Sequence, residues 1–192
     1  MAAQNDPQAP ALRRGDSAVM PVLLILGLGV TVAIILAVYG RVHEPTGFAL
    51  NVAGFSGPQA VKAWLATGAF VLALVQLLSG LAIVGRLGGM VAPPWVSPLH
   101  RWSGRLAVLL TVPVVVHCLY ALGFQTDTPR VLIHSFLGCF FYGAFTAKML
   151  LLTRRGLPGW AIPLIGGLVF IALFGLWLSS SVWFFVLRGI TF

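Results

Sequence analysis

Acidic residues are almost missing from this chain. Among its 192 residues only four are acidic, namely Asp6, Asp16, Glu44 and Asp127, and charged residues of both signs make up 8% of the sequence. None of the four lies inside an apolar run, so acid–base catalysis by carboxylates and a carboxylate proton relay across a membrane have no support. Because a soluble domain carries charge at about a quarter of its residues, the scarcity of charge indicates that lipid is the solvent.

Cysteine is also scarce, and the common enzyme motifs are missing. The two cysteines, Cys118 and Cys139, both fall in apolar segments and form no disulfide framework. The sequence contains no P-loop, no dinucleotide-binding fingerprint, no G-x-S-x-G and no metal-spaced His/Glu motif. The net charge of +8 comes from bases at the ends of apolar runs rather than from a basic stripe interleaved with aromatics, which argues against nucleic acid as a partner.

Long hydrophobic runs are what the chain does contain. Hydrophobic residues make up 59% of it, and its mean hydropathy is +0.98. Five runs approach or exceed the ~20 residues that cross a bilayer as a helix, and lipid leaves the backbone no other way to pair its polar groups. We therefore predict an all-α integral membrane bundle after a disordered cytoplasmic tail over residues 1–18. Its five transmembrane helices lie at about residues 19–39, 61–84, 99–122, 130–152 and 160–187.

Lysine and arginine predict the orientation of the bundle, since cytoplasmic loops carry an excess of both. With the N-terminus inside the cell, eight bases lie on the inner side and four on the outer side. The inner ones are Arg13, Arg14, Arg86, Arg101, Arg105, Lys148, Arg154 and Arg155, and the outer ones are Arg41, Lys62, Arg130 and Arg188. We predict an N-in, C-out, multi-pass protein of the plasma membrane.

Two histidines lie inside apolar runs in the stretch "VVVHCLYALGFQTDTPRVLIHSFLGCF". His117 is near the end of the third predicted helix, His134 is near the start of the fourth, and a short polar loop joins the two. A loop this short favours antiparallel neighbours. At 1.5 Å rise per residue both imidazoles then lie roughly 6 to 8 Å below the outer boundary. The spacing predicts two imidazoles at matched depth on adjacent helices.

That arrangement suits a bis-histidine haem, in which two neutral imidazoles bind one iron from opposite faces of the porphyrin. Arg130 precedes His134 by one helical turn, where it can pair with a haem propionate. Gly138 follows His134 by one turn and lets a flat macrocycle approach. We predict one haem b, with His117 and His134 as metal ligands and Arg130 and Gly138 as further cofactor-binding residues.

Two other interpretations of the histidines remain open. Each can be structural, with its imidazole hydrogen-bonded between helices of a membrane anchor or accessory subunit of a larger respiratory complex. The second, minor alternative is an iron–sulfur cluster held by His117, His134, Cys118 and Cys139. Helix geometry argues against the cluster, because Cys139 is roughly 7.5 Å deeper than His134 and on another side of its helix.

His100 opens the third predicted helix, about 25 Å along the axis from His117. The two cannot share an iron, and His43 is predicted at the opposite side of the membrane. We expect His100, with Arg101 and Arg105, to anchor the helix at the inner interface, with a quinone or headgroup site as the alternative.

Two resemblances add to these expectations. "LHRWSGRLAVLLTVPVVVHCLYAL" resembles the first histidine-bearing helix of transmembrane b-type cytochromes of the ferric-reductase kind, which often open with H-R-x-x-G-R-L and carry a deeper histidine. That family usually holds two haems, and here His100 lacks a partner. "VLIHSFLGCFFYGAFTAKMLL" and "LPGWAIPLIGGLVF" resemble an uncharacterised family of actinobacterial membrane proteins over most of the chain, which implies five spans and no assigned activity.

The function expected from the sequence is that of a membrane-embedded b-type cytochrome subunit. It would carry electrons between a quinol, or a partner subunit, and an acceptor at the outer face. Because the chain has no flavin or nicotinamide motif, the redox partner must be another protein chain, and the protein is an electron-transfer subunit rather than a complete enzyme.

Overall fold

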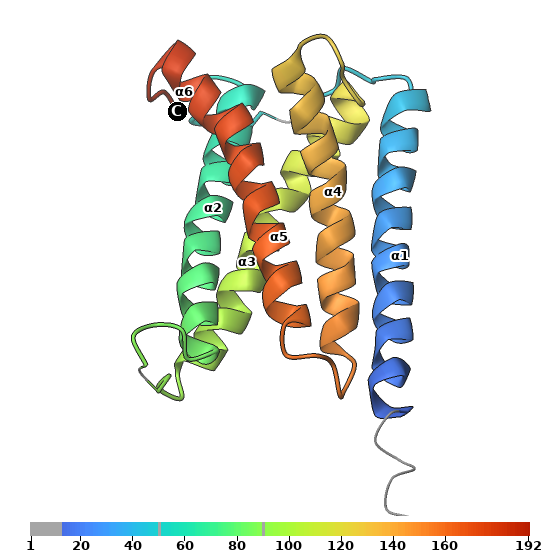
Figure 1. Ribbon diagram of the computed structural model, residues 1–192. Coiled ribbons are helices and arrows are strands. Elements are labelled where there is room, and N and C mark those ends of the chain that lie inside the picture. Colours follow the sequence, from blue (N-terminus) through green and yellow to red (C-terminus); the bar gives the residue numbers. More distant parts are fainter. Residues whose placement is uncertain (1–12, 50, 90) are drawn as a thin grey trace, which may run out of the picture.

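The chain folds into a bundle of long helices, shown in Figure 1. A computed structural model describes residues 13–49, 51–89 and 91–192, and no strand occurs among them. In chain order the elements are α1 (Arg13–Val42), α2 (Pro58–Ile83), α3 (Val96–Val116), the π-helical turn η1 (His117–Leu122), α4 (Pro129–Leu152), α5 (Ala161–Trp177), the π-helical turn η2 (Leu178–Val182) and α6 (Trp183–Arg188). η1 continues α3, and η2 and α6 continue α5.

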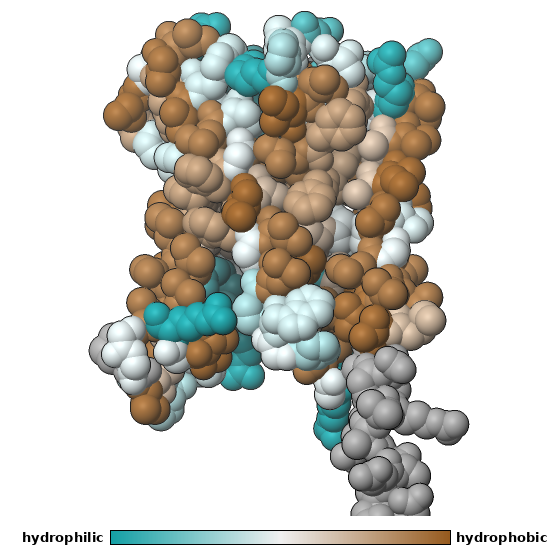
Figure 2. Space-filling view, in the orientation of Figure 1, coloured by the Kyte–Doolittle hydropathy of each residue, from teal (hydrophilic) through white to brown (hydrophobic). Residues whose placement is uncertain are grey.

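Five spans are long and apolar enough to cross a membrane: Val19–Val42, Pro58–Ile83, Val96–Leu122, Pro129–Leu152 and Ala161–Arg188. They confirm the five predicted helices to within a few residues. α1 already begins at Arg13, so it overlaps the predicted tail over residues 13–18, and residues 1–12 of that tail lie outside the described part. In Figure 2 apolar residues cover most of the visible flank, while the most hydrophilic ones gather mainly toward its two ends.

The helices run alternately up and down, so the bundle has two ends. The upper end in Figure 1 holds the loops after α1 and after η1 together with the C-terminus, and the lower end holds the other two loops. α4 packs between α1 and α5, whereas α2 packs against α3 and α5. α3 and α4 follow each other in the chain, but they approach each other closely at few points. A space is therefore left between α3 and α4.

Small residues set the closest approach in the bundle. A Cβ on Gly29 of α1 would lie 2.7 Å from the carbonyl oxygen of Gly143 in α4 and 2.9 Å from Cβ of Ala147. Close backbone contact of this kind replaces the hydrophobic driving force that helices lack in lipid. Beside it, Val22 and Leu151 contribute to a buried cluster that joins α1, α4 and α5.

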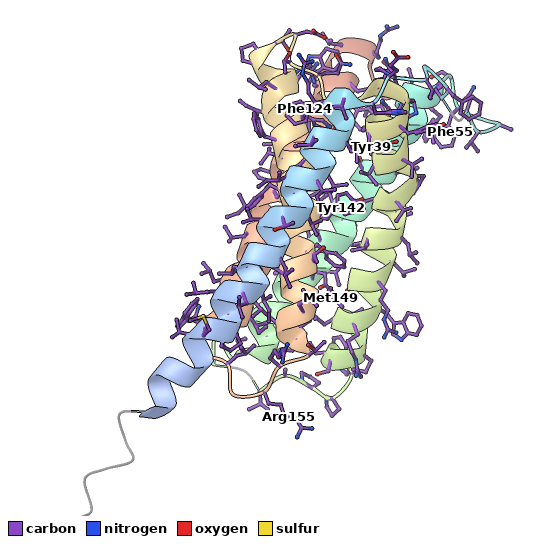
Figure 3. All side chains as sticks on the ribbon, turned by 90° about the vertical axis from the view of Figure 1, so that its right-hand side faces the viewer. Tyr39, Phe55, Phe124, Tyr142, Met149 and Arg155 are labelled. Atoms are coloured by element: carbon purple, nitrogen blue, oxygen red, sulfur yellow. The ribbon has the colours of Figure 1, made fainter. Side chains whose placement is uncertain are left out.

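The connection between η1 and α4 is fixed at both of its ends. Gly123 has φ of 73°, a left-handed conformation that favours glycine. The next N–H, of Phe124, donates to the carbonyl of Gly40 at the end of α1, at 2.6 Å. Thr128 caps α4 by accepting a hydrogen bond from the Val131 N–H at 3.3 Å, and Pro129 occupies the first helical position. Figure 3 shows Phe124 and Tyr39 at this end of the bundle.

Candidate functional site

A cavity of about 250 Å³ opens in the upper half of the bundle, where α3 and α4 stand apart. Its walls come from α1, α2, the end of α3 with η1, α4, η2 and α6, and most of its lining is apolar. We call it the central cavity and define it by six of its lining residues: Lys62, Cys118, Arg130, His134, Gly138 and Cys139. Basic and neutral polar groups line it without any acidic residue among the described ones. Its chemistry therefore suits a largely apolar ligand that carries negative charge.

The His134 ring contacts Ser179 of η2. Its Nδ1 lies 2.8 Å from Oγ of Ser179, and the same hydroxyl lies 2.7 Å from the carbonyl of Gly175 in its own helix. When the hydroxyl hydrogen goes to that carbonyl, Nδ1 carries the hydrogen of the imidazole and Nε2 carries the lone pair. Nε2 makes no hydrogen bond to the described residues, and none of their buried side-chain nitrogen or oxygen atoms lacks a partner. Nε2 is thus not fully enclosed, and His134 lines the cavity.

Arg130 lies one turn nearer the upper end than His134 and is tied to the same π-helical turn. Its Nη1 donates to the carbonyl oxygen of Ser179 at 2.5 Å, and its guanidinium carbon lies 3.9 Å from the centroid of the Trp183 ring. A half-buried arginine held by a carbonyl and an aromatic face keeps its charge and further N–H donors for an anionic group. The arginine and the histidine are therefore positioned by one short segment.

His117 lies at a neighbouring hollow, which we call the rim hollow. Its volume is about 610 Å³, it is open toward the upper end, and we define it by Ser56, Gln59, Lys62, His117, Arg188 and Thr191. Gln59, Lys62, Leu122 and Phe184 line both the rim hollow and the central cavity, so the two adjoin. The structure brings His134, Arg130 and Gly138 together at the central cavity and places His117 at the adjoining space.

His117 and His134 line different spaces because of the way α3 packs. The short loop does make α3 and α4 antiparallel, as expected, but α3 packs along α2 while α4 packs between α1 and α5. The predicted direct packing of these two helices is therefore wrong over most of their length. The Tyr142 hydroxyl bridges them at mid-depth, where it lies 2.9 Å from Oγ1 and 3.2 Å from the carbonyl oxygen of Thr111, and Figure 3 shows Tyr142 at that level.

Gly138 leaves room on its side of the cavity. A Cβ added there would meet only Cδ2 of Leu176, at 3.9 Å, so the glycine is not required by close helix packing. Its neighbour Cys139 and, across the cavity, Cys118 are both free thiols. The described residues contain no group of three or more His, Cys, Asp or Glu placed to hold a metal ion, which argues against the four-ligand iron–sulfur alternative.

Two contributors to the site escaped the sequence analysis. Lys62 entered it only as an outer positive charge, although a lysine inside an apolar run is itself a signal of a site. Ser179 belongs to the run Ser179–Ser180–Ser181, where nothing in the sequence singles out the one hydroxyl that contacts His134. Lys62 could have been found from its position inside an apolar run, whereas the role of Ser179 depends on the packing of η2 against α4.

His100 lies at the other end of α3 and ties that helix to α2. Its Nδ1 is 2.8 Å from Oγ of Ser79, whose hydrogen goes to the Val75 carbonyl at 2.6 Å. Gln76 reinforces the joint by donating to the His100 carbonyl and to Oγ of Ser103. His100 thus contacts a neighbouring helix in addition to its expected place at the lower end, and it lines neither of the two spaces above.

Comparison with known families places residues 20–192 in DUF6529, a family of unknown function, and the chain belongs to that family. The expected membership of an uncharacterised family of membrane proteins agrees with this match, while the likeness to ferric-reductase cytochromes finds no support in it. No curated protein and no solved structure matches the chain.

Proposed function

We propose that this member of DUF6529 is a membrane-embedded electron-transfer subunit that holds one haem b at the central cavity. The observation that carries the proposal is the contact of the His134 ring with Ser179. Its Nδ1 lies 2.8 Å from the Ser179 hydroxyl, its Nε2 makes no hydrogen bond to the described residues, and the residue lines a cavity within a membrane-spanning bundle. Histidines that bind metals nearly always donate their other ring N–H in this way, since that bond fixes the ring and raises its basicity.

The residues that α4 and α2 contribute to the cavity fit a haem well. From α4, His134 offers a nitrogen ligand, Gly138 leaves open space beside it and Arg130 supplies a positive charge for a propionate, and Lys62 of α2 supplies a second charge. Arg130 already has the aromatic and carbonyl contacts that keep its side chain in place without an acidic partner. Three groups of different chemistry therefore converge on the same space.

The α3 side must adjust before a second ligand can reach the iron. A volume of about 250 Å³ lies below the ~300–1,000 Å³ of typical sites for organic ligands, and His117 faces the adjoining rim hollow. Widening the gap between η1 and α4 would join the two spaces. Few contacts hold η1 and α4 together, so this opening costs little free energy. We propose His117 as the second ligand in this widened state.

A bound haem would supply one-electron redox chemistry, while the protein would set its orientation, exclude water and neutralise its propionates. We propose that the electrons come from a quinol or from a partner subunit and leave to an acceptor at the outer face of the plasma membrane. The proposal assigns the upper end of the bundle to the outer side, as the distribution of Lys and Arg predicts.

A visible absorption spectrum of the purified protein, before and after titration with haemin, tests the proposal. We expect the reduced protein to show a b-type α band, His134→Ala to lose it, and Ser179→Ala to bind haem roughly 10- to 100-fold more weakly, as outer-shell partners typically do. The matched control is His100→Ala, because His100 has the same 2.8 Å bond to a helix serine but lines neither space. A colourless protein that takes up no haemin contradicts the proposal.

The second candidate function is a non-catalytic membrane anchor, favoured by the similarity of the two histidine–serine pairs. His134 joins α4 to η2 and His100 joins α3 to α2, each through Nδ1 at 2.8 Å. If both are structural, His134→Ala and His100→Ala lower the thermal stability of the protein by similar amounts, and neither changes a spectrum. If the two variants lose similar stability but only His134→Ala loses haem, the protein is more than a membrane anchor.

A further inference from the structure

The rim hollow gathers positive charge without any acidic counterpart. Lys62 from α2 and Arg188 from α6 line it together with His117, and the described residues that line it include no Asp or Glu. Lys62 is half-buried, and Arg188 is exposed at the mouth. Two cations that share one concave space repel each other unless an anion or water separates them, and the low-dielectric surroundings strengthen that repulsion.

Packing holds the segment that carries Arg188 against α2, so that Arg188 lines the same hollow as Lys62. Trp64 of α2 donates from Nε1 to the carbonyl of Thr191 at 2.9 Å and stacks on Phe192, with the ring centroids 4.7 Å apart. Phe184 of α6 is buried against Ala60 and Ala63. The segment after η2 is therefore held against the start of α2, and it brings Arg188 and Thr191 to the hollow.

Neutral donors complete the lining. Ser56, Gln59 and Thr191 contribute neutral polar side chains. A bound cation would need carboxylate oxygens, and the described residues that line the hollow include no Asp or Glu. The composition of the hollow selects for a group that accepts many hydrogen bonds and carries negative charge.

From these observations we infer that the rim hollow binds an oxyanion, a phosphate or carboxylate group, between Lys62 and Arg188. The group can belong to an anionic phospholipid of the surrounding leaflet or to a small soluble anion, since the hollow is open at the end of the bundle. This inference goes beyond the proposed haem function and does not depend on it. Lys62 lines both spaces, but Arg188 and Thr191 line the rim hollow and not the central cavity, so Arg188 tests the anion site alone.

The test uses the full chain in two arms at constant ionic strength. In nanodiscs of neutral phosphatidylcholine, inorganic phosphate and citrate are titrated while thermal unfolding is recorded. In the second arm, the fraction of phosphatidylglycerol in the nanodiscs is raised without soluble anion. We expect a saturable rise in Tm in at least one arm, and Lys62→Gln and Arg188→Gln each to weaken the apparent affinity about tenfold, the cost of one charged hydrogen bond.

Arg41→Gln is the matched control, because Arg41 is an exposed base at the same end of the bundle that lines neither space. It should keep the wild-type affinity. A response to phosphate or citrate identifies a soluble anion, and a response to phosphatidylglycerol alone identifies the lipid. If neither arm saturates, or if Arg41→Gln weakens binding as much as Arg188→Gln does, the inference is wrong. Haem binding by Arg188→Gln is measured separately, so that the two proposals fail independently.

Discussion

His134 and His100 show how one local hydrogen bond can serve two different surroundings. Each imidazole has its Nδ1 at 2.8 Å from a serine hydroxyl whose own hydrogen is used within its helix. When the serine hydrogen goes to the carbonyl of its own helix, Nδ1 of each imidazole carries the hydrogen and Nε2 carries the lone pair. His134 alone lines a cavity, together with Arg130 and Lys62. At the scale of the residue, the space around the free nitrogen distinguishes a candidate ligand from a joint between helices.

The Tyr142–Thr111 hydrogen bond yields a prediction at the same scale. We expect Tyr142→Phe to lower the free energy of unfolding by about 0.6 kcal/mol, the average for hydrogen bonds between helices in a membrane, because it removes the direct polar bridge between α3 and α4. Thermal unfolding in detergent, compared with Tyr39→Phe, measures the effect. Tyr39 is exposed and its hydroxyl has no partner in the described part of the chain. If Tyr142→Phe and Tyr39→Phe lower the free energy of unfolding equally, the bridge between α3 and α4 does not stabilise the protein.

Two π-helical turns distinguish the elements that surround the site. η1 begins at His117, and η2 supplies Ser179, the residue that contacts both His134 and Arg130. Such turns are rare and frequently occur at functional sites, since the extra residue changes the direction of side chains and frees a carbonyl. In α3 the change of helix type follows Pro113, which lacks an N–H for the helical ladder. Each of the two long helices is thus interrupted where it lines the central cavity or the rim hollow.

The contact between α1 and α4 allows a test at the scale of elements. A Cβ on Gly143 would overlap the carbonyl oxygen of Gly29 and lie 2.9 Å from Cβ of Ala33. We expect Gly143→Ala to lower the free energy of unfolding by about 1–3 kcal/mol, since overpacking forces the two backbones apart. Thermal unfolding in detergent, without added denaturant, measures the loss of stability. The control is Gly27→Ala on α1, where a Cβ meets nothing within 4 Å, and a loss there of similar size would refute this explanation.

The whole molecule carries its charge unevenly, and this predicts its orientation. The lower end receives twice as many Lys and Arg as the upper end, eight against four, so we expect the lower end to face the cytoplasm. Glu44→Cys in the upper loop should react with a membrane-impermeant maleimide in intact cells, whereas Gly159→Cys in a lower loop should react only after permeabilisation. Cys118 and Cys139, half-buried and buried, make the unsubstituted chain the background control. The opposite pattern of labelling would invert the assignment.

The sequence by itself determined the number, limits and helical nature of the spans, and it placed Arg130, His134 and Gly138 on successive turns of one helix. It could do so because hydrocarbon requires about 20 apolar residues per crossing and leaves the backbone no partner outside the helix. Only the tertiary structure decided that α3 packs on α2, that His117 lies at a separate hollow, and that Lys62 and Ser179 join the site. In lipid the face of a helix that meets protein is as apolar as the face that meets acyl chains, so hydropathy does not identify its neighbours.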